Sequence, residues 1–219
     1  MKLVLFNYGR PGLLREDGVV DITDAVPSLR GQETMKGLIA NFAGLRNRLV
    51  HMEGEGTSQA LSQLSLLPPL PKPNKLLSMS GNYREFSARN PSPMRGFFQS
   101  SAALISPEDT VMLQPDEVNI FHHEAELLLV FGDSSKDVGR VSAMDCVFRY
   151  TCGVDVSTRL PANQRGGRNT TSMPISPWKS FDTFGPIGSV HRHQRRNSCP
   201  PSPSPRFDRG IRRPPGQET

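Results

Sequence analysis

Two glutamates stand one residue apart at the start of a strongly apolar run. Glu124 and Glu126 belong to the segment HHEAELLLVFG, residues 122–132. Alternate side chains of a β-strand share a face, so both carboxylates would project from the same side. A buried, unpaired charge costs several kcal/mol, and the pair therefore needs a cation, a polar partner or water. The segment predicts a strand that carries a charged site near its beginning.

A divalent metal ion is one cation that this pair would attract. Neighbouring carboxylates raise each other's pKa unless a cation neutralises them, and oxygen ligands favour magnesium, manganese or calcium over zinc or copper. Asp155, in the segment YTCGVDVSTR, lies in a second strand-like run and is the third ligand that we predict. Three carboxylates from two strands would leave positions open for substrate and water. The structural alternative places both glutamates on a solvated edge strand and Asp155 at a turn.

The elements that would hold these carboxylates are mostly strands. Between them, SAMDCVFRY (residues 142–150) predicts a short helix with Ser142 as its N-cap. Strands dominate and do not alternate regularly with helices, which indicates a β-rich α+β fold. The predicted strands are KLLSMSGNY (75–83), AALIS (102–106), TVMLQP (110–115), EAELLLVFG (124–132) and YTCGVDVS (150–157).

The first 70 residues predict a separate N-terminal α/β module. KLVLF (2–6) predicts a strand, and Asp17-Gly18 is a hairpin signal before a second strand. Residues 34–52 have apolar side chains near helical spacing and predict one amphipathic helix. LLPPLPKPNK (66–75) is a proline-rich connector that cannot continue a helix. We therefore expect a boundary near residue 70, with the main domain over 71–189.

The basic charge of the chain is concentrated after residue 189. Residues 190–219 contain seven arginines and two acidic residues, whereas residues 1–189 contain 19 basic and 19 acidic residues. The segment 190–219 is rich in proline, arginine and serine and almost lacks apolar residues, so we expect it to be disordered. The neutral remainder argues against a nucleic-acid partner.

The sequence offers no signal for a membrane or for secretion. No segment approaches the roughly 20 apolar residues that a spanning helix needs, and the first residues read as a strand and turn. The three cysteines contain no CxxC pair, which indicates ordinary reduced thiols. We expect a cytoplasmic protein, with the mitochondrion left open.

Five segments together resemble the fumarylacetoacetate hydrolase family. Their order and approximate spacing match that family, and the resemblance covers residues 1–189. It implies that family's mixed β-sandwich roll, preceded by a small N-terminal module. The segments are KLLSMSGNYREF, FFQSSAALISPEDTVMLQP, HHEAELLLVFG, YTCGVDVSTR and KSFDTFGPIG.

The resemblance implies a site and a chemistry. Members act on small 2-oxo or 2,4-dioxo acids by C–C hydrolysis, decarboxylation or enol–keto isomerisation through a metal-stabilised enolate, and complete members are expected to be homodimers. Mg²⁺ or Mn²⁺ is the expected metal, with Ca²⁺ as a further possibility. The implied residues are Glu124, Glu126 and Asp155 for the metal, Lys179 for catalysis and substrate binding, and Tyr83, Arg159 and Gln164 for substrate contacts.

The chain departs from the family pattern at three places. Phe86 and Arg89 stand where hydrolytic members carry a water-activating His–Glu pair, and a phenylalanine cannot abstract a proton. An inserted loop displaces Gln164 from its usual position. The family domain also continues beyond KSFDTFGPIG, so the fold is expected to be incomplete. The alternative is therefore an inactive truncated isoform or paralogue that at most associates with a full-length member. The nearest substitutes for the missing base are Glu85, His122 and His123.

Overall fold

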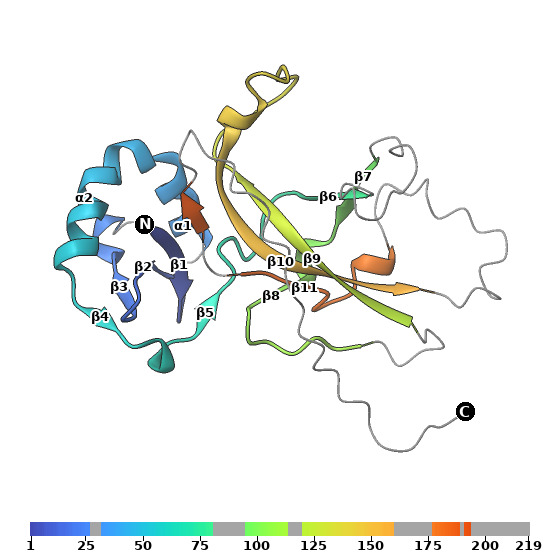
Figure 1. Ribbon diagram of the computed structural model, residues 1–219, viewed down its shortest axis with the longest axis horizontal. Coiled ribbons are helices and arrows are strands. Elements are labelled where there is room, and N and C mark those ends of the chain that lie inside the picture. Colours follow the sequence, from blue (N-terminus) through green and yellow to red (C-terminus); the bar gives the residue numbers. More distant parts are fainter. Residues whose placement is uncertain (27–31, 81–94, 114–119, 160–176, 189–190, 194–219) are drawn as a thin grey trace.

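The protein is β-rich and contains two α-helices in the part that the structure describes. The computed structural model describes residues 1–26, 32–80, 95–113, 120–159, 177–188 and 191–193. Figure 1 shows the helices beside the N-terminal strands, with a long pair of strands extending away from them. The predicted β-rich α+β class is confirmed.

Five short strands and two helices form the N-terminal part. The strands are β1 (Lys2–Phe6), β2 (Arg10–Leu14), β3 (Val19–Asp21), β4 (Ser58–Gln59) and β5 (Leu66–Leu67), and the helices are α1 (Gln32–Ala40) and α2 (Phe42–Glu55). The predicted hairpin turn joins β2 to β3, and Gly18 has a φ of 146°. A Cβ at this position would collide with the backbone oxygen of Gln59, so the turn requires glycine. Leu3 and Leu5 pack against the helices through Met35, Leu38 and Leu49.

The single helix predicted over residues 34–52 is wrong, because the chain breaks it at Asn41. This residue has a φ of −106° and a ψ of 12°, outside helical geometry. Its side-chain Nδ2 donates to the Gly37 oxygen at 2.9 Å, which gives the end of α1 a local hydrogen bond. The backbone N–H of Asn41 donates to the same oxygen at 3.1 Å, and the Leu45 N–H donates to the Asn41 oxygen at 3.1 Å, so helical hydrogen bonds continue across the break.

Two long antiparallel strands dominate the rest of the fold. β9 (Ile120–Phe131) pairs with β10 (Val147–Arg159) along almost their whole length. The short strand β12 (His191–His193) pairs with both β1 and β10. One eight-stranded sheet therefore runs through both parts of the chain, in the order β4-β3-β2-β1-β12-β10-β9, with β5 also paired to β1.

The sheet includes residues from all three of the domains expected from the sequence. Strand β12 lies inside the segment 190–219 that was expected to be disordered, and its three residues pair within the sheet. The remainder of that segment, 194–219, lies outside the described residues. The division into 1–70, 71–189 and 190–219 stays a prediction.

Shorter elements surround the long strands. β6 (Leu76–Ser80) pairs antiparallel with β7 (Arg95–Gln99), and β8 (Leu104–Ile105) pairs in parallel with β11 (Gly185–Pro186). The predicted strand at 110–115 is not found over its described residues 110–113. The helix predicted at 142–150 is a single turn before β10, and Ser142 precedes it without a capping side-chain bond. Among the described residues, the 3₁₀ turns are η1 (Thr23–Ala25), η2 (Leu61–Gln63), η4 (Ser101–Ala103), η5 (Ala143–Cys146) and η8 (Pro177–Lys179).

A buried arginine joins helix α2 to strand β10. The Arg149 guanidinium lies 4.4 Å from the Phe42 ring centroid and 4.6 Å from that of Phe148. Burial, followed by the nearby charge of Arg46, lowers the pKa of Arg149 to about 10. The two aromatic faces provide the favourable contact for this cation.

Candidate active site

Strands β9 and β10 place Glu124 directly opposite Asp155. The register also sets Glu126 opposite Gly153. Exposure alternates along β9: both glutamates are half-buried, whereas Ala125 between them is exposed. The two glutamates therefore share the inner face of the strand, as the two-residue period predicts.

The ammonium group of Lys179 lies between two of these carboxylates. Its Nζ donates to Glu124 Oε2 at 2.6 Å and to Asp155 Oδ2 at 2.5 Å. Only 13% of the Lys179 side chain and 9% of the Asp155 side chain are exposed. Turn η8 delivers the lysine, so three separate elements meet at this cluster, which we call the carboxylate–lysine cluster (Glu124, Asp155 and Lys179). Partial burial strengthens the attraction between its charges.

Strand β7 contributes two further residues that the sequence reasoning missed. Gln99 Nε2 donates to Asp155 Oδ1 at 2.9 Å. The Lys179 Nζ lies 5.7 Å from the centroid of the Phe97 ring. Alternation within RGFFQ places Phe97 and Gln99 on one face, which was the available signal. Their partners are far away in sequence, so no local pattern could have identified the contacts.

The surroundings of the Asp155 carboxyl raise its pKa. Burial is the largest effect and raises the pKa of Asp155, and the charge of Glu124 raises it further. The hydrogen bond and charge of Lys179 and the hydrogen bond from Gln99 lower this pKa. The net direction is upward, so the protein groups do not fully offset the cost of burying this charge. A further positive charge would therefore be favourable here.

The donor set fits a hard divalent cation in its chemistry. Glu124 and Asp155 offer carboxylate oxygens across the strand pair, and the Lys179 ammonium marks a position where a cation lies between them. Within the described ranges, no three histidine, cysteine, aspartate or glutamate side chains are grouped closely enough to hold a metal ion. The triad that includes Glu126 therefore stays a prediction.

Most of the other residues predicted for the site lie outside the described part of the chain. Tyr83 and Gln164 lie outside the described residues, as do Glu85, Phe86 and Arg89. The Arg159 backbone ends β10 opposite Ile120, but its side chain is not described. His122 and His123 are exposed near the start of β9.

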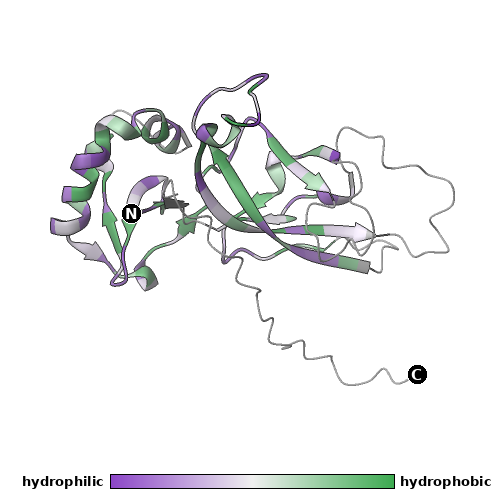
Figure 2. Ribbon diagram, turned by 45° about the horizontal axis from the view of Figure 1, so that its top comes forward, coloured by the Kyte–Doolittle hydropathy of each residue, from purple (hydrophilic) through white to green (hydrophobic). Residues whose placement is uncertain are grey.

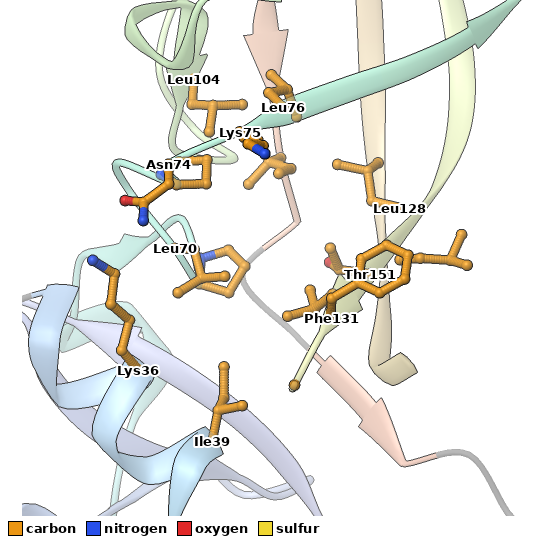
Figure 3. Close-up of a pocket in the computed structure, with 16 residues that line it drawn as sticks. Lys36, Ile39, Leu70, Asn74, Lys75, Leu76, Leu104, Leu128, Phe131 and Thr151 are labelled. Carbon is orange, nitrogen blue, oxygen red and sulfur yellow. The ribbon is translucent and has the colours of Figure 1, made fainter. Parts of the chain in front are cut away.

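A cavity of about 430 Å³ lies away from the carboxylate–lysine cluster. Figure 3 shows it between Ile39 of α1 and residues of the β9–β10 pair such as Leu128 and Thr151. Its lining is mainly apolar and includes none of the three cluster residues.

None of the helices in the described part of the chain has the length and apolar character to cross a membrane.

Comparison with known proteins identifies the family of this chain. A family model described as fumarylacetoacetate (FAA) hydrolase C-terminal matches residues 76–201. The oxaloacetate tautomerase fahd2, mitochondrial, of Xenopus laevis is 28% identical over 204 residues, which are 86% of this chain and 60% of that protein. The maleylpyruvate hydrolase of Aquipseudomonas alcaligenes is 26% identical, over 81% of this chain and 69% of its own length. The chain thus spans 60% of the length of the frog protein.

A solved structure agrees with these relatives. The maleylpyruvate hydrolase of Sphingobium sp. SYK-6, crystallised with manganese(II) and pyruvate, superposes with a TM-score of 0.72 and is 31% identical. The match covers 88% of this chain and 67% of that one. The family match spans more than half of the chain and includes Gln99, both cluster carboxylates and Lys179. The chain therefore belongs to the fumarylacetoacetate hydrolase family.

Proposed function

We propose that this protein is a divalent-metal-dependent enzyme that acts on a small 2-oxo or 2,4-dioxo acid. The observation that carries the proposal is the placement of Lys179 between Glu124 and Asp155, within hydrogen-bond distance of both. Support comes from the Sphingobium relative, whose structure contains manganese and pyruvate. Oxaloacetate and maleylpyruvate, named for two other relatives, are also small oxo acids.

Glu124, Glu126 and Asp155 are the proposed ligands for Mg²⁺ or Mn²⁺, with Ca²⁺ as a weaker candidate. A bound ion of this kind would supply Lewis acidity at the oxygen atoms of an oxo acid. The chemistry of the donors supports this assignment, because hard cations prefer carboxylate oxygens. The raised pKa of Asp155 points the same way, since its buried charge is only partly offset by Lys179 and Gln99.

Lys179 is the proposed catalytic residue. Its ammonium is largely buried, so it presents a fixed positive charge in a setting where electrostatic interactions are stronger than in water. Its donors are now directed at Glu124 and Asp155. Neutralisation of these carboxylates by a divalent cation would release the donors for a substrate carboxylate or a developing oxyanion.

The proposed reaction class rests on two positions of the sequence. Phe86 and Arg89 occupy the positions of a water-activating pair, and neither can serve as a general base at neutral pH. Enol–keto isomerisation and decarboxylation, which need no activated water, are therefore at least as well supported as C–C hydrolysis. Tyr83, Arg159 and Gln164 remain the proposed further substrate contacts.

The test measures turnover and metal binding on the same protein. Purified chain with Mn²⁺ is assayed with oxaloacetate for enol–keto conversion and decarboxylation, and with maleylpyruvate for hydrolysis. Glu124→Gln should lower the rate by more than the about 10- to 100-fold that loss of an outer partner of a metal ligand costs, because it removes a ligand charge. Ala125→Ser is the matched control, since this exposed neighbour lies on the opposite face of β9 and its substitution should leave the rate unchanged.

The opposite result would favour the alternative function. A folded chain that neither binds Mn²⁺ nor converts any of these acids would be a catalytically inactive family member. In that case, association with a full-length family member would be its remaining biochemical property. The proposal is overturned by this result, and equally by a Glu124→Gln variant that retains full turnover.

A further inference from the structure

The two carboxylate oxygens of Asp155 have different protein partners. Oδ1 accepts a hydrogen bond from Gln99 Nε2 at 2.9 Å, whereas Oδ2 accepts one from Lys179 Nζ at 2.5 Å. An ionised carboxylate only accepts hydrogen bonds, so the amide nitrogen of Gln99 must face it. The Gln99 bond therefore fixes the rotation of the carboxylate and directs Oδ2 toward Lys179 and Glu124.

The backbone on both sides of Gln99 holds this amide in place. Gln99 ends β7 and is paired in register with Leu76 of β6. The next residue, Ser100, donates its backbone N–H to Ser180 Oγ at 3.2 Å. Ser180 directly follows Lys179, so the segment around Gln99 contacts both the aspartate and the turn that delivers the lysine.

The chemistry of glutamine suits an orienting role. Its amide is neutral, so it can hold one oxygen of Asp155 without reducing the negative charge that attracts a divalent cation. A lysine or arginine in the same place would compete with that cation through its own charge. Partners of this kind orient the residues that bind a metal directly.

We propose that Gln99 is a positioning residue, which holds Asp155 so that Oδ2 is presented to the divalent cation. This inference rests on the proposed function, because it assumes that Asp155 is a metal ligand. Loss of such an outer partner typically weakens metal binding by about 10- to 100-fold. The role is independent of the substrate, and metal affinity alone can test it.

The test compares Mn²⁺ dissociation constants, measured by the electron paramagnetic resonance signal of free Mn²⁺. Gln99→Met keeps the length of the side chain and removes the donor, whereas Gln99→Asn keeps an amide that is too short to reach Oδ1. Both variants should bind Mn²⁺ about 10- to 100-fold more weakly than the wild type. Phe98→Leu is the matched control, because Phe98 is exposed on the opposite face of the same strand and its variant should bind within about twofold of the wild type.

The outcomes separate this inference from the proposed function. If the wild type binds Mn²⁺ and both folded Gln99 variants bind it equally well, Gln99 has no positioning role, although the metal site stands. If the wild type binds no Mn²⁺, the proposed function fails and this inference fails with it. A purely structural role would lower the melting midpoint of both variants without changing the affinity of the folded fraction. If Gln99→Met does not fold, Gln99→Asn decides the question alone.

Discussion

At the scale of single residues, the carboxylate–lysine cluster depends on the ammonium group of Lys179. Lys179 supplies the positive charge that lies between Glu124 and Asp155, at 2.6 and 2.5 Å. Removal of one partner from a largely buried ion pair leaves an uncompensated charge, which is more costly than the pair itself is favourable. The lysine therefore has a structural consequence that can be measured without any substrate.

Lys179→Met should lower the free energy of unfolding of the metal-free chain by about 3 kcal/mol. Urea unfolding in the presence of a chelator measures this loss. Mn²⁺ should then stabilise the variant by a larger increment than the wild type, because the ion no longer competes with the ammonium for Glu124 and Asp155.

A second lysine provides the control for this experiment. Lys36 pairs with Glu33 at 2.9 Å on the exposed surface of α1, three residues along the same helix. Lys36→Met should cost less than about 0.5 kcal/mol, the usual value of such pairs. Equal losses for the two variants would contradict the special role of Lys179.

Asp155 predicts a pH dependence whose sign follows from its raised pKa. Between the ordinary value near 4 and the raised value in the folded chain, the native state binds more protons than the unfolded state. The contribution of Asp155 to the unfolding free energy therefore decreases as the pH rises through this window, and the loss is complete above the raised value.

Asp155→Asn removes this titration from the metal-free chain. The unfolding free energy of the variant, relative to the wild type, should rise from about pH 4 to pH 7 by about 1.4 kcal/mol for each unit by which the pKa is raised. Urea unfolding at intervals of pH gives both curves. Parallel curves for variant and wild type would show that the carboxyl is not perturbed.

At the scale of elements, close packing against Gly153 keeps β10 in place opposite Glu126. A Cβ at Gly153 would lie 2.6 Å from Leu128 Cδ1 and 3.1 Å from the backbone oxygen of Pro186. The leucine side chain can move, but the backbone beside β11 yields less easily. The absence of a side chain therefore lets β9, β10 and the segment after Lys179 approach one another.

Gly153→Ala should lower the free energy of unfolding by about 1 to 3 kcal/mol, the cost of overpacking a fitted site. Gly139→Ala is the matched control, because no atom lies within 4 Å of its added Cβ. Thermal and urea unfolding of both variants check the difference. A Gly153 variant as stable as the control would mean that the strands separate at this point without cost.

At the scale of the whole molecule, the sequence predicts which side chains share a strand face, but not which distant residues come into contact. The two-residue period placed Glu124 and Glu126 on one face, because alternation is a property of any strand. The contacts of Asp155 with Lys179 and Gln99 join residues 24 and 56 positions apart, so they depend on how β7, β10 and η8 come together. Their geometry could not be derived from a local pattern.

The break between the two helices and the pairing of β12 were likewise not predictable from local sequence patterns. Helical periodicity is continuous through residues 34–52, yet one asparagine amide that bonds to Gly37 accompanies the break between α1 and α2. The pairing of β12 with β1 and β10 joins the first strand of the chain to residues near 190. The composition of residues 190–219 favoured disorder, and a strand of three residues is too short to be recognised from its sequence pattern.

The outer face of β9 leads to a prediction about association. Leu127, Leu129 and Phe131 are 54%, 42% and 57% exposed, on the side opposite the two glutamates. Figure 2 shows hydrophobic residues along the long strands. Exposed apolar side chains in a row on one face of a strand favour contact with another molecule.

We expect the isolated chain to self-associate at micromolar concentrations, as measured by sedimentation velocity. Replacing Leu127, Leu129 and Phe131 together by threonine should shift the chain towards monomer, because threonine preserves strand propensity while it removes apolar surface. Val141→Thr alters an exposed apolar residue outside the strands and should leave the association unchanged. If the triple variant associates as strongly as the wild type, the contact lies on another surface. Far-ultraviolet circular dichroism of each variant separates lost association from lost folding.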